Sequence, residues 1–423
     1  MHRRPLLSLF LLAPLAACGE AAAQDSGPAE GKGLELKELE RITEEIRAQV
    51  EELRGEKFAT PVKVAIASAE EFRAYVKGRI DVNETPEELA ADEEVAKLCG
   101  VLPPDFDYMG ETLKLIESQV GGFYDPETKT FYLMQGFDGG VARIILAHEL
   151  THALDDQIFG LDDELDVVED NSDAEWAYYA VIEGSGTAVM DLWTLKNIKS
   201  LDPSTVKELA SMGVDELKDA PPFLWRPLLG AYTQGEQFLK ERPEELDLSA
   251  ATRRAFEAPP RSSEELLHPK KYWDPDERDE PKPVHFDRSA LPKGWDVRDE
   301  DTLGELGLGM VVEPLKSRHG LDGMLAVATA RYTSREVQGW GGDRYVLLGR
   351  GEQDRLLVLA TVWDTEKDAV EFAEGVEALR EHLLAGPADA LEVRREGASV
   401  DVVLARGIGA EQADAVRRAV RLE

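Results

Sequence analysis

Basic residues are scarce in this 423-residue sequence. It contains 48 lysines and arginines against 84 aspartates and glutamates, which gives a formal net charge of −36. Binding to nucleic acid, or electrostatic docking on anionic lipid, requires a basic surface that neutralises phosphate. We therefore expect no nucleic-acid partner, and we interpret the acidic excess as a soluble, self-repelling surface.

The apolar stretch near the N-terminus is too short to span a membrane permanently. It covers residues 6–13 and follows a basic region at residues 2–4, the order found in a secretory leader. Residues 15–18, Leu-Ala-Ala-Cys, resemble the bacterial lipobox, which implies cleavage before Cys18 and acylation of its thiol. An ordinary secretory signal that is cleaved nearby is the alternative.

Residues 19–33 are rich in Ala, Gly, Ser and Glu and have little to bury, so we predict a flexible tether. Several acyl chains on Cys18 would anchor the protein without a basic patch. We expect a protein of the cell envelope that is lipid-anchored and faces the periplasm or the exterior.

Cysteine is nearly absent, because the chain contains only two. If Cys18 is acylated, Cys99 alone remains, and no intramolecular disulfide can hold the fold together. Cys99 lies at the apolar end of a predicted helix. We expect it to be a buried small hydrophobe rather than a reactive thiol.

The chain is longer than one hydrophobic core usually supports, so two domains are expected. Residues 274–292 are dense in Pro, Asp, Glu and Arg and are typical of a linker. We predict a mainly helical domain at 34–285 with a small sheet and an edge hairpin. A small α+β accessory domain at 286–423 follows, without a metal or nucleophile constellation, so the fold class is α+β.

Apolar periodicity and capping signals predict the individual elements. Helices are predicted at 34–54, 68–80, from 85, 109–118, 138–160, 172–196 and within 201–257, with a strand at 62–66 and a hairpin at 120–134. The C-terminal part reads as strands at 345–348, 356–362, 391–393 and 400–404, with helices at 365–384 and from 411. The glycine-rich segment 339–344 is interpreted as a tight turn.

The helix predicted at 138–160 carries an H-E-x-x-H pattern. His148 and His152 are four residues apart, so both imidazoles leave one helix face and can bind one metal ion. Glu149 lies about 100° around the helix, which suits a base beside a metal-bound water. Asp156 lies one turn beyond His152 and could accept the second N–H of an imidazole. A purely structural helix would not explain two histidines and a glutamate among aliphatic residues.

A third ligand is expected from the next helix. Glu183 lies 31 residues beyond His152, and small residues follow it in mid-helix. Glycines there lower helix propensity, and one reason to accept them is the close approach of another helix or of a metal. Two antiparallel helices would bring Glu183 to the third zinc position. Its rivals for that position are Glu175, Asp173 and Asp170.

The string HELTH at 148–152, with a helical Glu-Gly downstream, resembles the gluzincin zinc metallopeptidases, the thermolysin-like group. HELTHALDDQ at 148–157 and VIEGSGTAVM at 181–190 are similar to a set of bacterial and archaeal envelope members with HELTHALQDQ and EGDA. The resemblance covers about residues 60–285. It implies a zincin-like domain, one Zn²⁺ per chain bound by His148, His152 and Glu183, and Glu149 as the catalytic base.

The sequence departs from this pattern at several positions. Asp155 replaces an expected glutamine, and Ser185-Gly186 replace an expected Asp-Ala. Thr187 stands where thermolysin-like enzymes carry an aspartate that orients a histidine, so Asp156 or Asp191 would have to take that part.

The resemblance also suggests roles outside the two helices. A downstream histidine and a tyrosine stabilise the oxyanion in thermolysin-like sites, and His268 and Tyr232 are the candidates here, although a surface or capping role for His268 is the alternative. The hairpin at 120–134 could pair with an extended substrate, or could be purely structural.

We therefore predict a zinc-dependent peptidase that acts on a peptide or protein substrate. One alternative is a non-catalytic, zinc-containing envelope lipoprotein that binds peptides or partners. Another is a zinc amidase that acts on the cell wall. An intact Glu149 speaks against a purely structural zinc site, which has no use for that carboxylate.

Overall fold

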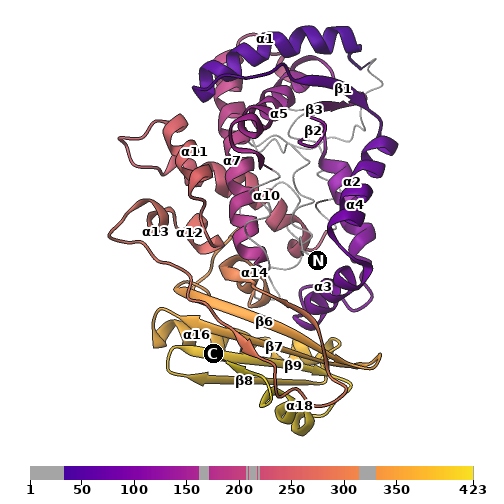
Figure 1. The fold of residues 1–423 in the computed structure, drawn as a ribbon, viewed down its shortest axis with the longest axis vertical. Helices are drawn as coiled ribbons and strands as arrows, with labels where there is room; N and C mark the ends of the chain where they lie inside the picture. The colour runs from indigo at the N-terminus through magenta and orange to yellow at the C-terminus, as the bar shows by residue number, and fades with distance from the viewer. Residues whose placement is uncertain are drawn as a thin grey trace.

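The computed structural model describes residues 33–161, 171–205, 208, 217, 220–313 and 330–422. Cys18, the leader, nearly all of the predicted tether and Asp170 lie outside these residues. Figure 1 shows a helical part with a small sheet at one end of the molecule and a larger sheet at the other. The α+β class is thereby confirmed. Among the described helices, none is long and apolar enough to cross a membrane.

The small sheet comes from the N-terminal part of the chain. Strand β1 (Lys63–Ala67) pairs in parallel with β3 (Thr130–Met134), and β2 (Gly122–Asp125) pairs antiparallel with β3. The order β1-β3-β2 leaves β2 at an edge, so the predicted hairpin with an edge strand is confirmed.

Helices α1 (Leu36–Arg54), α2 (Ala69–Asn83) and α4 (Tyr108–Gln119) pack against this sheet. Helix α3 (Pro86–Leu98) follows α2 in the chain. The capping box predicted at Ser68 is present, and Thr85 forms another.

Two long helices form the centre of the helical part. Helix α5 (Gly139–Phe159) and helix α7 (Ser172–Asn197) contact each other, and α10 (Pro222–Lys240) packs along α7. Gly160 ends α5 with φ 72°, as predicted, but Asp138 makes no side-chain cap. The predicted capping box at Ser172 is wrong by one residue, because the Asn171 side chain accepts from Ala174 N.

Three shorter helices follow α10 in the part of the chain that the structure describes: α11 (Leu248–Glu257), α12 (Ser263–Leu267) and α13 (Pro269–Trp273).

The C-terminal sheet is antiparallel with the order β5-β6-β7-β9-β8. Its strands are β5 (Asp296–Asp301), β6 (Trp340–Arg350), β7 (Asp354–Trp363), β8 (Ala390–Glu396) and β9 (Ser399–Arg406). The helices here are α14 (Gly304–Val311), α16 (Glu366–Ala378), α17 (Arg380–Ala385) and α18 (Ala410–Arg417), and the short strands β4 (Phe286–Asp287) and β10 (Arg421–Leu422) pair together.

The tight turn predicted at 339–344 is wrong, because β6 runs through most of this segment. The pairing with β7 shifts register between Trp340 and Gly342, which marks an irregularity of the β-bulge type. The chain from the linker lies against the glycines: Lys282 N donates to Gly341 O at 2.7 Å, and a Cβ on Gly342 would overlap the Lys282 carbonyl. The glycines thus serve a close backbone approach within a strand.

One face of this sheet packs against helix α3. Val95 and Leu98 of α3 join Leu347, Leu357 and Phe372 in a single buried cluster. The segments on either side of the predicted linker therefore share hydrophobic core.

Candidate metal centre

Helices α5 and α7 bring His148, His152 and Glu183 together. The Nε2 atoms of the two histidines lie 2.8 Å apart, and Glu183 Oε2 lies 3.1 Å from His148 Nε2 and 3.5 Å from His152 Nε2. All three residues are buried. Glu183 is thus the residue that completes the site predicted from the spacing, while its rivals Glu175 and Asp173 are absent from the ligand cluster.

The geometry of these atoms fits a tetrahedral metal ion. Zn–N and Zn–O bonds of about 2.0–2.1 Å separate neighbouring ligand atoms by about 3.3 Å. The three separations between the ligand atoms bracket that value, and both imidazoles present Nε2 to the same point. Among the described residues, no fourth His, Cys, Asp or Glu joins the cluster. Three protein ligands are what a catalytic zinc site provides.

The small residues after Glu183 serve two close approaches. A Cβ on Gly184 would overlap the backbone of Gly235, so this glycine lets α10 cross α7. A Cβ on Gly186 would lie 2.7 Å from His148 Cε1 and 2.9 Å from His152 Cε1. Both reasons considered for glycine in mid-helix, a neighbouring helix and the metal ligands, therefore apply.

The charges of the cluster are strongly coupled. Burial raises the pKa of Glu183, but the two histidines outweigh burial and lower its pKa to about 2. Burial lowers the pKa of His148, with His152 acting in the same direction. For His152, burial is outweighed by the carboxylates of Glu183, Glu149 and Asp155, which raise its pKa to about 9. The raised pKa of His152 and the lowered pKa of Glu183 both result from the attraction between the imidazole and the carboxylate.

Glu149 lies beside the ligands and is buried. Burial, helped by Glu183 and opposed by His152, raises its pKa to about 8. The backbone N–H of Tyr124 in strand β2 lowers it, so the edge strand reaches this carboxyl group. Within the described part of the chain Glu149 Oε2 has no hydrogen-bond partner. A buried carboxylate oxygen without a partner is costly, and a metal-bound water would satisfy it.

Tyr232 is the predicted oxyanion candidate that the fold places at the site. Its ring stacks on His148 with centroids 5.7 Å apart and an interplanar angle of 20°. Burial raises the pKa of Tyr232, and the nearby carboxylates of Glu183 and Glu149 raise it further. Tyr179 interacts with Glu183 and Tyr232 and was missed. Tyr179 lies one turn before Glu183 on α7, and this spacing could have placed it on the ligand face of the helix.

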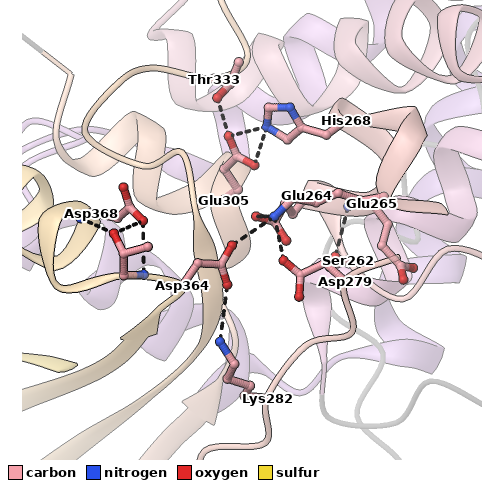
Figure 2. A network of polar contacts seen from close by, with 12 residues as sticks. Ser262, Glu264, Glu265, His268, Asp279, Lys282, Glu305, Thr333, Asp364 and Asp368 are labelled. Atoms are coloured by element: carbon pink, nitrogen blue, oxygen red, sulfur yellow. Dashed lines mark hydrogen bonds and ion pairs between the residues drawn. The ribbon is translucent and has the colours of Figure 1, made fainter. Parts of the chain in front are cut away.

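His268 does not join this site. Its Nε2 lies 3.0 Å from Glu305 Oε1 on α14, and Thr333 Oγ1 donates to the same carboxyl group (Figure 2). His268 precedes Pro269 between two short helices and faces α14. A buried glutamate fixes it there. The oxyanion role suggested for His268 stays a prediction.

Asp156 pairs with groups other than the imidazole predicted for it. Its carboxylate accepts from Tyr124 Oη at 2.7 Å and from Lys129 Nζ at 2.8 Å, so it holds the hairpin instead of an imidazole. The Nδ1 atoms of both ligand histidines have no side-chain partner among the described residues, although the Gly186 backbone raises the pKa of His148. Asp191, the other candidate, interacts with Glu236 on α10.

Asp155 lies behind the ligands in a buried polar cluster. Its Oδ1 accepts from Arg54 Nε of α1 at 2.9 Å, and its Oδ2 accepts from Ser185 Oγ of α7 at 2.5 Å. Arg54 and Asp155 are both 0% exposed. The cluster thereby connects three helices next to His152.

A second group of carboxylates, Glu264, Asp279 and Asp364, has ligand-like spacing. Figure 2 shows that they converge between α12, the linker and the end of β7. Lys271 Nζ lies 2.6 Å, 2.7 Å and 3.2 Å from them, respectively. The ammonium group supplies the cation that these carboxylates require, so they are an ion-pair cluster between the two parts of the chain.

Comparison with known proteins reaches only the C-terminal part. A family model described as a domain of unknown function (DUF8575) matches residues 292–420. No curated protein and no solved structure matches the chain. The matched segment contains none of the residues of the metal centre.

Proposed function

We propose that the protein is a zinc-dependent peptidase. One observation carries this proposal: His148, His152 and Glu183 converge as three ligands, while Glu149 is buried beside them with an unpartnered oxygen. The gluzincin resemblance at residues 148–157 and 181–190 supports peptide bonds as the substrate. The finer assignment of the helical part as zincin-like is part of the same proposal.

Zinc held by the three ligands would supply a polarised water near neutral pH. Glu149 would take up a proton at Oε2 and deliver it to the leaving amine. The Tyr232 hydroxyl, which lies beside Glu183 and interacts with Tyr179, would donate to the developing oxyanion. Strand β2 is an edge strand whose Tyr124 N–H faces Glu149, and an extended peptide would pair beside it.

The rival proposal is a non-catalytic zinc protein of the envelope. The burial of the three ligand side chains, which are 0–5% exposed, is the observation that favours it. A peptidase must admit a substrate to the metal, whereas a structural or partner-binding site need not. Glu149 distinguishes the two proposals, because only catalysis uses its carboxylate.

The deciding experiment compares the wild type with Glu149→Gln, and with Glu52→Gln on the exposed face of α1 as a matched control. Zinc content is measured after reconstitution, and cleavage is measured on casein, an unstructured protein. Zinc in all three proteins, with cleavage lost only in Glu149→Gln, supports the peptidase. Zinc without cleavage in any of them favours the rival, and a failure to bind zinc overturns both proposals.

We also propose that acylated Cys18 anchors the protein in the cell envelope. The support is the lipobox-like sequence at residues 15–18. Membrane fractionation of wild type and Cys18→Ala tests it: the variant should leave the membrane fraction, and equal fractionation of the two proteins would contradict the anchor.

A further inference from the structure

A cavity of about 150 Å³ lies away from the metal centre. It lies where α3 and α4 meet α7, α10 and α14, and it is partly open to solvent. Trp176 lines it and precedes Glu183 by seven residues on α7, which places the cavity about 10 Å along the helix from the ligands. It therefore lies at the junction of the helical part and the C-terminal part, a common place for small-molecule sites.

The walls of the cavity are apolar and partly aromatic. The Trp176 indole N–H donates to Pro227 O at 2.9 Å, which fixes the ring as one wall. Tyr108 and Phe223 are half-buried at the rim, with ring centroids 6.3 Å apart. The small side chain of Ala96 leaves the space open. An apolar protein cavity of about 150 Å³ accommodates a benzene-sized molecule.

A single hydroxyl group points to a polar feature of the ligand. Thr112 is 3% exposed, lines the cavity, and within the described residues its Oγ1 has no hydrogen-bond partner. A buried hydroxyl without a partner is unfavourable, and a ligand with a hydroxyl or amide group would satisfy it.

The charges around the cavity restrict the ligand further. Three aspartates line the cavity: Asp92, Asp173 and Asp301. Asp173 Oδ2 and Asp301 Oδ1 accept from the backbone N–H groups of Ser263 and Ser172, at 3.0 Å and 2.9 Å. No Lys, Arg or His is among the described residues that line the cavity. An anionic ligand would find no counter-charge here.

We propose that this cavity binds an uncharged, benzene-sized aromatic group whose hydroxyl or amide pairs with Thr112. The group belongs either to a free small molecule or to the side chain of a tyrosine in a bound peptide. The site is separate from the metal centre and does not depend on peptidase activity.

Titration calorimetry of the full mature protein with phenol and with toluene tests the proposal, because the two differ only in hydroxyl against methyl. Phenol should bind one to one, and about five-fold more tightly than toluene, the value of one neutral hydrogen bond. Thr112→Val should abolish that difference, and Ala96→Leu should abolish binding of both. Benzoate should not bind.

Thr252→Val on α11 is the matched control, since its hydroxyl donates to Leu248 O and lies outside the cavity lining. Unchanged phenol affinity in Thr112→Val, or in a folded Ala96→Leu variant, would overturn the proposal. If Ala96→Leu does not fold, Thr112→Val alone decides.

N-acetyltyrosinamide identifies the source of the ligand. If N-acetyltyrosinamide competes with phenol, the cavity binds the side chain of a peptide tyrosine. If phenol binds and N-acetyltyrosinamide does not, the ligand is a free small molecule. Affinities should be equal with and without zinc, so failure here is separate from failure of the peptidase proposal.

Discussion

The buried pair of Arg54 and Asp155 allows a quantitative prediction for Asp155→Ala. Both side chains are 0% exposed, and Asp155 Oδ1 lies 2.9 Å from Arg54 Nε. Removal of the carboxylate would leave a buried guanidinium without a counter-ion and would remove the acceptor of Ser185 Oγ. Loss of one partner of a buried pair costs about 3–5 kcal/mol, so the free energy of unfolding should fall by that amount. Urea denaturation followed by circular dichroism measures it.

A second pair between the same two helices is the control. Glu45 Oε1 of α1 lies 3.2 Å from Arg143 Nη1 of α5, and the two side chains are 44% and 28% exposed, respectively. Glu45→Ala should cost no more than about 1 kcal/mol because water screens the pair. The double variant Arg54→Met/Asp155→Leu should recover most of the lost stability, since no charge is then buried. A loss below about 1 kcal/mol in Asp155→Ala, or strictly additive losses in the double variant, would refute this reasoning.

Three further predictions concern the metal centre and the junction. Gly186→Ala should abolish stoichiometric zinc binding, measured by metal analysis, because the added Cβ would overlap both imidazoles. Gly78→Ala on α2, where the added Cβ has no atom within 4 Å, should bind zinc normally. Equal zinc content in the two variants would contradict the close approach. Zinc binding at pH 7 should release about one proton or more, and zinc affinity should weaken as pH falls, because the pKa of His152 is raised to about 9 without the ion. Calorimetry in buffers of different ionisation enthalpy measures the number of protons released. A value of zero would contradict this prediction. Burial raises the pKa of Asp173 to about 8, far above its unfolded value of about 3.9. The folded state therefore binds an extra proton between these two values, and the free energy of unfolding should fall as pH rises from about 4 to about 8. Asp173→Asn should flatten this pH dependence, measured by urea denaturation between pH 5 and pH 8, and a profile parallel to that of the wild type would contradict the assignment.

Local signals in the sequence predicted most elements of the fold and the ligand set. The four-residue spacing of His148 and His152 fixes their common helix face, and the distance to Glu183 allows one connection between two packed helices. Strand β6 was predicted only at residues 345–348, and its glycine-rich first part was missed because glycine normally weakens a strand. The path of Lys282 against Gly342 shows why glycine is used there.

The surroundings of the ligands could not be read from spacing. Arg54 reaches Asp155 across 101 residues, and no periodicity connects them. Asp156 carries the spacing of a histidine partner, yet Lys129 and Tyr124 on the hairpin hold it. His268 was assigned by resemblance, and the position of α14, with Glu305, decided its partner. Each outcome depends on which distant element packs nearby.

The contact between Asp155 and Ser185 joins two positions at which the chain differs from the metallopeptidase pattern it resembles. The pattern that the sequence resembles has glutamine at the first position and aspartate at the second, and this chain has aspartate and serine. Asp155 Oδ2 and Ser185 Oγ lie 2.5 Å apart, so an acid at either position would lie at the same contact between α5 and α7, where Asp155 also binds Arg54. Asp155→Asn should therefore weaken zinc binding by about 10- to 100-fold, as loss of a group that supports metal ligands does. Asp155→Asn/Ser185→Asp should restore most of the affinity, because the acid returns to the same contact. Affinity as low as that of Asp155→Asn would show that the contact does not support the site.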